Sequence, residues 1–384
     1  MMKLVLLLVL SGCGSSFVYF PGPNPVDPEP QDESKPMAVF HVPPTVANVH
    51  LGKAVNEFVG PEANGNYMPS CVDVKEFGRP QNTSGSTVDV ELSFIQNTKE
   101  LFDKTSRNFT TAIALKGWGS LTAGHSAGTT NSIEREVKAN SSYALLRVVK
   151  TYVPSNVKKV VWLENAADLF PKPESLLERC GTGYINSVTM GAQAFGLIEC
   201  ESTNASEKRK VDEVIKASAG YSSVSAEASL TKNIEKINKS SSGGCRLYAS
   251  YAGGSGSVAL DYEKFSQSLV DYIMAGTPES AVPVRYETSS YENVQSVAFD
   301  AEFLGKVRRF ITKQGHYINP RVVNMNSYFD RIGKMKAESS FLGELSVEVK
   351  QAIADLKSRA YSKSLEIVAC AEDVSKCDEG NEWL

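Results

Sequence analysis

The stretch CGTGYINSVTMGA, Cys180 to Ala192, opens a run of strand-like sequence that continues to Cys200 as GTGYINSVTMGAQAFGLIEC. Apolar and β-branched residues in this run are interrupted by single glycines. A glycine inside a strand usually marks a turn, a bulge or a close approach of another backbone. The pattern therefore predicts one long strand that contains such glycines.

The segments around this strand predict a sheet accompanied by helices. Alternating apolar residues at 88–94, and the runs SSYALLRVVKTYV (141–153), CRLYASYAGG (245–254) and PVRYETSSY (283–291), are typical of strands. Helical patterns occupy IQNTKELFDKTSRN (95–108), ESLLERC (174–180), LDYEKFSQSLVDYIMAG (260–276) and most of 296–366. The chain of 384 residues is long enough for one large or two ordinary domains.

The Cys180–Ala192 stretch resembles the signature of the membrane-attack-complex/perforin family. Four residues match the family pattern, namely Gly181, Thr182, Tyr184 and Gly191. Four residues depart from the pattern. Cys180 replaces an aromatic residue, Gly183 replaces a histidine and Ala192 replaces a second glycine. Upstream, Pro173 occupies the position of a further aromatic residue that is usual in the family. The order of the surrounding segments, from about residue 50 to 290, is also similar to that of the family.

The resemblance implies an α+β fold, with a bent and twisted four-stranded antiparallel sheet flanked by two helical clusters. In this family each cluster unfurls into an amphipathic β-hairpin when monomers assemble in a ring on a membrane. The resemblance also implies that Gly253 and Gly254 let the sheet bend. We assign residues 37–290 to this domain, and residues 291–384 to a mostly helical C-terminal extension.

Residues 201–244 are the stronger candidate for a membrane hairpin. Val211, Val214, Ile215 and Ser218 have helical spacing, whereas Val224, Ala226, Ala228 and Leu230 alternate with polar residues as in a strand. Two transmembrane legs and a turn need roughly 22 to 25 residues, which this segment exceeds and residues 117–141 only just reach. The alternation is equally compatible with an ordinary half-solvated strand in a static protein.

The N-terminus has the features of an export signal. Residues 1–12 contain Lys3 followed by a short apolar run, and Leu10-Ser11-Gly12-Cys13 resembles the bacterial lipobox, in which the cysteine is acylated. Residues 13–36 are rich in proline and acidic residues, which favours an extended tether. We therefore expect a lipoprotein anchored through Cys13 at a bacterial outer membrane or cell surface, retained there or released. The alternative is an ordinary signal peptide followed by a chance cysteine.

Six further cysteines are available for disulfides in an exported chain. Cys200 and Cys245 bracket the candidate hairpin segment, and Cys370 with Cys377 would close a small terminal loop. The connectivity, including that of Cys71 and Cys180, does not follow from the sequence, and buried thiols are the alternative.

One local motif favours a catalytic function. Gly124-His125-Ser126-Ala127-Gly128 matches the G-x-S-x-G pattern of a hydrolase nucleophile elbow. The residues before Ser126 do not predict a buried strand, and those after it do not predict a helix, both of which the elbow requires. No clustered metal ligands, Walker loop or dinucleotide motif occurs in the sequence, so we expect no enzyme activity, cofactor or metal.

These observations lead to three functional hypotheses. The first is a pore-forming protein that oligomerises and inserts β-hairpins into a target membrane, with a membrane lipid or a surface receptor as partner. The second is a non-lytic surface adhesion or binding protein on the same fold. The third, more distant, is a serine hydrolase that uses Ser126. A net charge of −4 and the absence of basic runs argue against a nucleic-acid partner.

Overall fold

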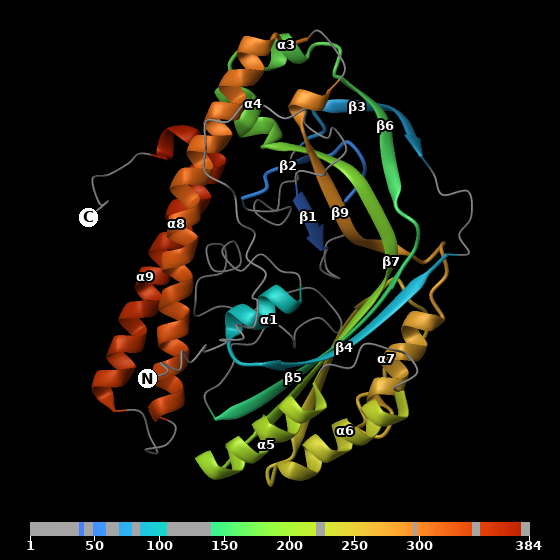
Figure 1. Cartoon of the computed structure of the whole chain (residues 1–384), viewed down its shortest axis with the longest axis vertical. Helices are drawn as coiled ribbons and strands as arrows, with labels where there is room; N and C mark the ends of the chain where they lie inside the picture. The colour runs from blue at the N-terminus through green and yellow to red at the C-terminus, as the bar shows by residue number, and fades with distance from the viewer. Residues whose placement is uncertain are drawn as a thin grey trace, which may run out of the picture. The chain divides into compact units, whose positions relative to one another are not determined.

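A computed structural model provides the fold (Figure 1). It describes residues 38–41, 49–58, 69–78, 85–105, 140–219, 227–294, 298–339 and 346–377. The strands are β1 Ala38–His41, β2 Ala54–Val55, β3 Val72–Gly78, β4 Thr87–Ile95, β5 Ser141–Thr151, β6 Ser155–Trp162, β7 Gly183–Glu201, β8 Cys245–Ala252 and β9 Val282–Ser290. The helices are α1 Thr98–Lys104, α3 Ala166–Leu169, α4 Pro173–Cys180, α5 Ala205–Ser218, α6 Glu227–Ser240, α7 Phe265–Met274, α8 Ala301–Ser339 and α9 Val347–Glu372, with short 3-10 turns at Tyr291–Asn293 and Val374–Lys376.

The long strand β7 organises the whole sheet. Its first half pairs with β9, which pairs in turn with β1, and its second half lies between β5 and β8. β4 extends the sheet beyond β5, and β3 joins through β6. All of these strand pairs are antiparallel. The long strand predicted from Gly181 to Cys200 is thus the axis on which the other strands are assembled.

The expected four-stranded antiparallel sheet corresponds to one half of the observed sheet. That half has the order β4-β5-β7-β8, and we call it the four-stranded half. The complete described sheet has nine strands, so the predicted strand count was too low. The strands missed by the sequence analysis are β1, β2, β3 and β6, which are short or half exposed and carry a weak periodic signal.

The four-stranded half is buried on both faces, which explains the nearly continuous apolar sequence of β5. One face contributes Ala144, Leu146 and Val148 to a core with α5, α6 and α7. The opposite face contributes Tyr143 and Leu145 to a smaller core with Leu101 of α1. A strand covered on both faces loses the polar and apolar alternation that marks a half-solvated strand.

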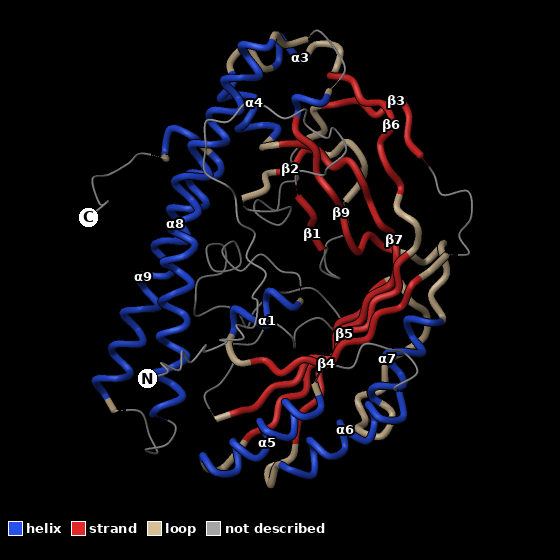
Figure 2. The backbone as a smooth tube through the Cα atoms, in the orientation of Figure 1, coloured by secondary structure: helices blue, strands red, loops and turns tan. Residues whose placement is uncertain are grey.

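The sheet bends between its two halves (Figure 2). The β5 ladder on β7 ends at the pair Thr151↔Gly191, and the β9 ladder begins there with Gly191↔Val282. The β9 ladder also shifts register between Thr189 and Met190. Because β7 exchanges its neighbours at Gly191, the strand is free to change direction at this residue.

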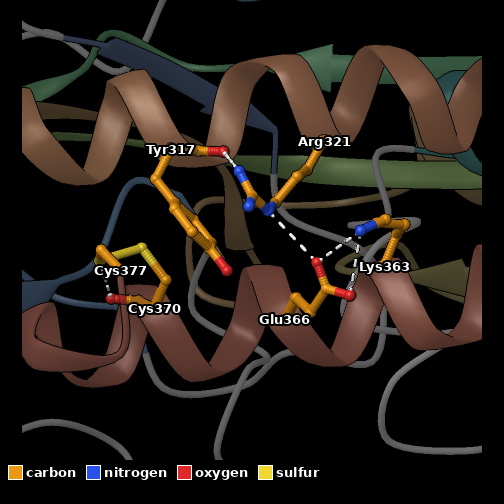
Figure 3. Close-up of polar contacts among 6 residues, drawn as sticks. All are labelled: Tyr317, Arg321, Lys363, Glu366, Cys370 and Cys377. Atoms are coloured by element: carbon orange, nitrogen blue, oxygen red, sulfur yellow. Dashed lines mark hydrogen bonds and ion pairs between the residues drawn. A yellow bond between two sulfur atoms is a disulfide. The ribbon is translucent and has the colours of Figure 1, made fainter. Parts of the chain in front are cut away.

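The α8–α9 pair forms the C-terminal helical part, as predicted. Figure 3 shows how the two helices are joined: the Arg321 Nε atom lies 3.2 Å from the Glu366 carboxylate, which also binds Lys363 Nζ at 2.8 Å. The Arg321 guanidinium stacks over the Tyr317 ring at 3.3 Å. Beneath these polar contacts lies an apolar core that includes Ile318, Met325, Phe329, Ile332, Ile353, Leu356 and Ile367.

The beginning of α8 shares a core with the sheet. The Trp162 ring stacks on Tyr291 at 5.0 Å and meets Phe299 edge-on at 4.7 Å. Further along α8, Gln314 Nε2 donates to the Cys370 carbonyl of α9 at 2.9 Å. Next to β2, Asn56 Nδ2 donates to the Ala371 carbonyl of α9 at 2.6 Å. The C-terminal helices are therefore packed directly on the β7–β9 end of the sheet.

Candidate membrane-insertion segment and sheet bend

The helices α5 and α6 form the connection between the neighbouring strands β7 and β8. The ladder of these strands reaches the pair Cys200↔Cys245, which a disulfide joins across the two strands. The two cysteines are 45 residues apart in sequence. The helix pair is thus a covalently closed loop whose two ends are held side by side.

The Glu207 carboxylate ties the beginning of α5 to the end of α6. It accepts hydrogen bonds from the Thr203 N–H and hydroxyl at 2.8 and 2.7 Å, and from the Ser242 N–H and hydroxyl at 2.5 and 2.6 Å. These four donors stabilise the ionised form and lower the pKa of Glu207 to about 2. Asn204 caps the same helix by accepting from the Glu207 N–H.

The apolar faces of the two helices hold them on the sheet. Val211 and Ile215 of α5, and Leu230, Ile234 and Ile237 of α6, are at most 2% exposed. They pack on the face of the sheet that carries Ala144 and Ile198. Burial of a large apolar side chain contributes about 1.5–3 kcal/mol, so the five together contribute roughly 10 kcal/mol. The helices can leave the sheet only if another apolar environment receives these side chains.

The outer faces of α5 and α6 are charged. Lys208 pairs with Asp212 at 3.1 Å and Lys239 with Glu235 at 3.5 Å, each one helical turn apart. Such surface pairs contribute only a few tenths of a kcal/mol each. The helix pair is therefore held by its apolar side, whereas its charged side keeps it soluble.

The residues predicted for a membrane hairpin are helical where the structure describes them. Ala228 lies in α6, and Leu230 is buried against the sheet from the same helix. Val224 and Ala226 lie outside the described residues, as do Ser126 and nearly all of the candidate segment 117–141. In this state the helical spacing of the segment prevails over its strand-like alternation, because the sheet offers an apolar surface to a helix face.

Glycines allow backbones to approach closely at the bend. A Cβ atom on Gly191 would overlap the Lys150 carbonyl oxygen, and one on Gly253 would overlap the Gly191 carbonyl. Gly253 also has a φ of 78°, a backbone conformation that residues with a side chain rarely adopt. A Cβ on Gly254 would meet the Tyr272 carbonyl of α7. The residues that the resemblance marked as bend glycines lie at the junction of β7, β8 and α7.

Lys150 and Tyr152 connect this bend to the C-terminal end of α7. Lys150 Nζ donates to the carbonyls of Met274 and Gly276 at 3.2 and 2.8 Å, and the Tyr152 hydroxyl donates to Gly276 at 3.0 Å. A cation at a helix C-terminus is favourable because the last carbonyls lack helical partners. No local sequence pattern marks either residue, since their partners are 124 or 126 positions away.

The helix α7 also contacts α6 and the sheet. The Thr231 hydroxyl of α6 and the Ser266 hydroxyl of α7 are 2.8 Å apart. A Cβ atom on Gly196 of β7 would lie 2.7 Å from side-chain atoms of Phe265 and Leu269. The first turn of α7 thus contacts α6, and its C-terminal part contacts the glycines of the bend.

The signature residues at the start of β7 form a tight junction with the 54–57 segment. Gly181 has a φ of 66°, and a Cβ there would lie 2.5 Å from the Val55 carbonyl oxygen. The buried Thr182 hydroxyl accepts from the Glu57 N–H at 3.0 Å. Burial raises the pKa of Tyr184, whose ring lies 6.0 Å from the Tyr291 ring. These are residues that shape the fold and carry no reactive group.

The departure from the family pattern at Gly183 has a steric reason. A Cβ atom at this position would lie 2.5 Å from the Ser289 carbonyl oxygen of β9. The two strands approach so closely here that the histidine of the family pattern would not fit.

The structure contains three disulfides. Two join the pairs expected from the sequence, Cys200–Cys245 and Cys370–Cys377, and the third joins Cys71 to Cys180. The third bond connects the residue before β3 to the last residue of α4. The six cysteines in the described part of the chain are thus paired, so the alternative of buried thiols does not apply to them.

Within the described ranges, no cluster of histidine, cysteine, aspartate or glutamate side chains has an arrangement suited to a metal ion. The same part of the chain contains no helix with the length and apolar character required to cross a bilayer.

Comparisons with known proteins find similarity at the level of structure. No family model and no curated protein matches the sequence. Stonustoxin is 11% identical with a TM-score of 0.38, over 88% of this chain and 43% of its own. Suilysin, a cytotoxin from Streptococcus suis, is 16% identical with a TM-score of 0.29, over 56% of this chain and 42% of its own.

A third similar structure is a putative cell invasion protein with a MAC/Perforin domain from Bacteroides thetaiotaomicron. It is 14% identical with a TM-score of 0.28, over 61% of this chain and 55% of its own. The chain thus spans less than two thirds of each of these three proteins. The solved structures to which this chain is similar include two toxins and a protein with the MAC/Perforin domain that the Cys180–Ala192 stretch resembles.

Proposed function

We propose that this protein attacks membranes: copies assemble on a target bilayer, and the α5–α6 segment converts into a β-hairpin that crosses it. The observation that supports this proposal most directly is the position of α5 and α6 between two adjacent antiparallel strands. If the helices extend, β7 and β8 continue as one hairpin and their backbone groups pair with each other. A bilayer accepts strands only when the backbone is paired in this way.

The open edges of the four-stranded half support assembly into a homo-oligomer. Among the described residues, β4 pairs only with β5, and β8 pairs only with β7. An exposed strand edge is a template for another strand, and a closed ring leaves no edge in contact with lipid. The partners in this proposal are therefore other copies of the chain and a membrane lipid or surface receptor.

Export through residues 1–12 and acylation at Cys13 complete the proposal. A protein held on a surface by its lipid and a Pro-rich tether can reach a neighbouring membrane. These residues lie outside the described part of the chain, so this step rests on the sequence pattern alone.

A non-lytic surface protein is the second candidate. Gly183 and Ala192 are the observations that favour it, because they replace residues of the family signature. This candidate predicts that the protein binds a membrane or receptor without permeabilising it. The third hypothesis, a hydrolase using Ser126, predicts an activity that is lost in Ser126→Ala.

A disulfide staple between α6 and α7 tests the leading proposal. The Thr231 and Ser266 hydroxyls are 2.8 Å apart, so cysteines at both positions can be joined in the helical state. We expect oxidised Thr231→Cys/Ser266→Cys to bind liposomes and to release little or none of an encapsulated dye. Each single cysteine variant should release dye at about the wild-type rate.

Reduction should restore dye release by the stapled protein. Wild-type protein treated with the same reductant is the matched control, because the reductant also acts on the native disulfides. Undiminished dye release by the oxidised staple, with the bond verified by mass spectrometry, would contradict the conversion of α6. Binding without dye release by the wild type would favour the non-lytic candidate.

A further inference from the structure

The ladder between β7 and β8 defines how a longer hairpin would pair, if the proposed function is correct. Its last steps are Ile198↔Leu247, Glu199↔Arg246 and Cys200↔Cys245. The disulfide at the last pair prevents the two strands from sliding. An extension must therefore continue in the same register, which places Thr203 opposite Ser242.

Contacts beyond the disulfide already bring these next residues together. The Glu207 carboxylate is bonded to both Thr203 and Ser242. The Ser241 hydroxyl also donates to the Glu201 carbonyl at 2.8 Å. The two chain ends thus already lie close together before any helix has unfolded.

Continuation of this register pairs four of the five buried residues of the two helices with each other, and it places the fifth, Ile237, opposite Lys208 on the other face. Val211 comes to lie opposite Ile234, and Ile215 opposite Leu230. One face of the ribbon then carries Val211, Ile215, Ala217, Ala228, Leu230 and Ile234, and the other face carries Lys208, Lys210, Asp212, Lys216, Glu235 and Lys239. A slip by one residue would mix these sets, because alternate residues of a strand point to opposite faces.

The apolar face of this ribbon also carries charged residues. Glu207, Arg209 and Lys236 lie on it near the disulfide, and farther along, between Val211 and Ala217, its only charged residues are Glu213 and the residue opposite, Lys232. We infer that Glu213 and Lys232 become directly opposed cross-strand partners when the hairpin forms, and neutralise each other on its lipid-facing side. In the helical state both side chains are exposed, and no ion pair between them occurs in the described parts of α5 and α6. Directly opposed residues have Cβ atoms about 5 Å apart, within reach of an ion pair.

The physical reason is the cost of an isolated charge in a bilayer. A single charge on the lipid-facing side of a transmembrane strand is strongly unfavourable, and two like charges at this distance repel as well. A Glu–Lys pair avoids both costs, but only in the register that the disulfide imposes. A slip by two residues, which preserves the faces, would place Glu213 opposite Leu230 or Ile234 and leave its charge unpaired.

Charge reversal with compensation tests the pairing by dye release from liposomes. We expect Glu213→Lys alone and Lys232→Glu alone to slow release at least about tenfold, since each puts two like charges about 5 Å apart. The double variant Glu213→Lys/Lys232→Glu should return to within about twofold of wild type. Thermal unfolding of the soluble protein should be nearly unchanged in all three, because exposed charges contribute little.

The matched control exchanges the same charges in a mispaired combination. Lys239 is exposed on α6, but in the ribbon it lies on the other face, opposite Ser206. Glu213→Lys/Lys239→Glu should therefore remain as slow as Glu213→Lys. Failure of the first double variant to recover, or equal recovery of the mispaired one, would overturn the pairing while leaving hairpin insertion intact. If wild-type protein releases no dye, the proposed function fails, and this inference fails with it.

Discussion

At the scale of single residues, the bend in the sheet depends on the absence of side chains. Gly191 and Gly253 lie so close to neighbouring carbonyls that a Cβ atom on either would overlap one of them. The carbonyls belong to strand backbones, which cannot move aside as the end of a flexible side chain can. The bend therefore tolerates no substitution at these positions without movement of a strand.

We expect Gly191→Ala to lower the free energy of unfolding by about 2–4 kcal/mol, because the new methyl group forces β5 and β7 apart. Urea denaturation of the purified protein measures this difference. Gly305→Ala is the matched control, since no atom lies within 4 Å of the Cβ position and the residue is inside α8. That variant should be more stable by about 1 kcal/mol. A neutral Gly191→Ala would show that the bend does not need a glycine.

At the scale of elements, the same segment satisfies two periodicities. The helices α5 and α6 bury apolar residues at spacings of three and four, and in the proposed hairpin most of the same residues would pair across a ribbon. The proposed conversion would therefore use one set of side chains against two different apolar environments. The Glu207 carboxylate joins the beginning of α5 to the end of α6, at the base of that proposed hairpin.

The pH dependence of stability tests the role of Glu207. The folded pKa of about 2 lies below the usual value near 4.5, so the ionised form is favoured in the folded state. The resulting stability is present above about pH 4.5 and disappears as the pH falls toward 2. We expect Glu207→Gln to be less stable than wild type at pH 7 and to converge with it over this range. Thermal unfolding at several pH values measures the difference, and Glu213→Gln, which alters an exposed carboxylate, should show no such convergence.

At the scale of the whole molecule, the disulfides restrain different regions. Cys200–Cys245 closes the helix pair at the base of the ladder, and Cys370–Cys377 closes a short turn after α9. Cys71–Cys180 spans 109 residues and joins the residue before β3 to the end of α4. The bonds at Cys71 and Cys370 lie outside the α5–α6 segment, so they would not restrain the proposed conversion of that segment.

Removal of the two outer disulfides should have unequal effects. The entropy of closing a loop increases with its length, so loss of Cys71–Cys180 should cost about 5 kcal/mol and loss of Cys370–Cys377 about 2 kcal/mol. The double variants Cys71→Ser/Cys180→Ser and Cys370→Ser/Cys377→Ser should therefore rank in this order in urea denaturation. The reverse order would show that packing around the sulfur atoms outweighs loop entropy.

The elements with strong local patterns were predictable from the sequence. The alternation at 88–94 corresponds to β4, the apolar run at 141–153 to β5, and the long glycine-interrupted strand to β7. The ends of β7 and β8 could also be anticipated, because Cys200 and Cys245 bracket an ambiguous segment. β3 and β6 were missed because their ribbon is half exposed and mixes polar with apolar residues.

The sequence by itself determined the longer strands and most of the helices, since the repeat of apolar residues reflects the face that each element buries. The sequence also identified residues 201–244 as a segment in which apolar residues recur with both helical and strand-like spacing. The tertiary structure alone decided the Cys71–Cys180 bond, the contact of Lys150 with the end of α7, and the Glu207 bridge to Ser242. These contacts join residues 35 to 126 positions apart, and they depend on strand register and on how closely backbones approach at glycines. The local repeat of apolar residues contains no information about strand register or about how closely two backbones approach.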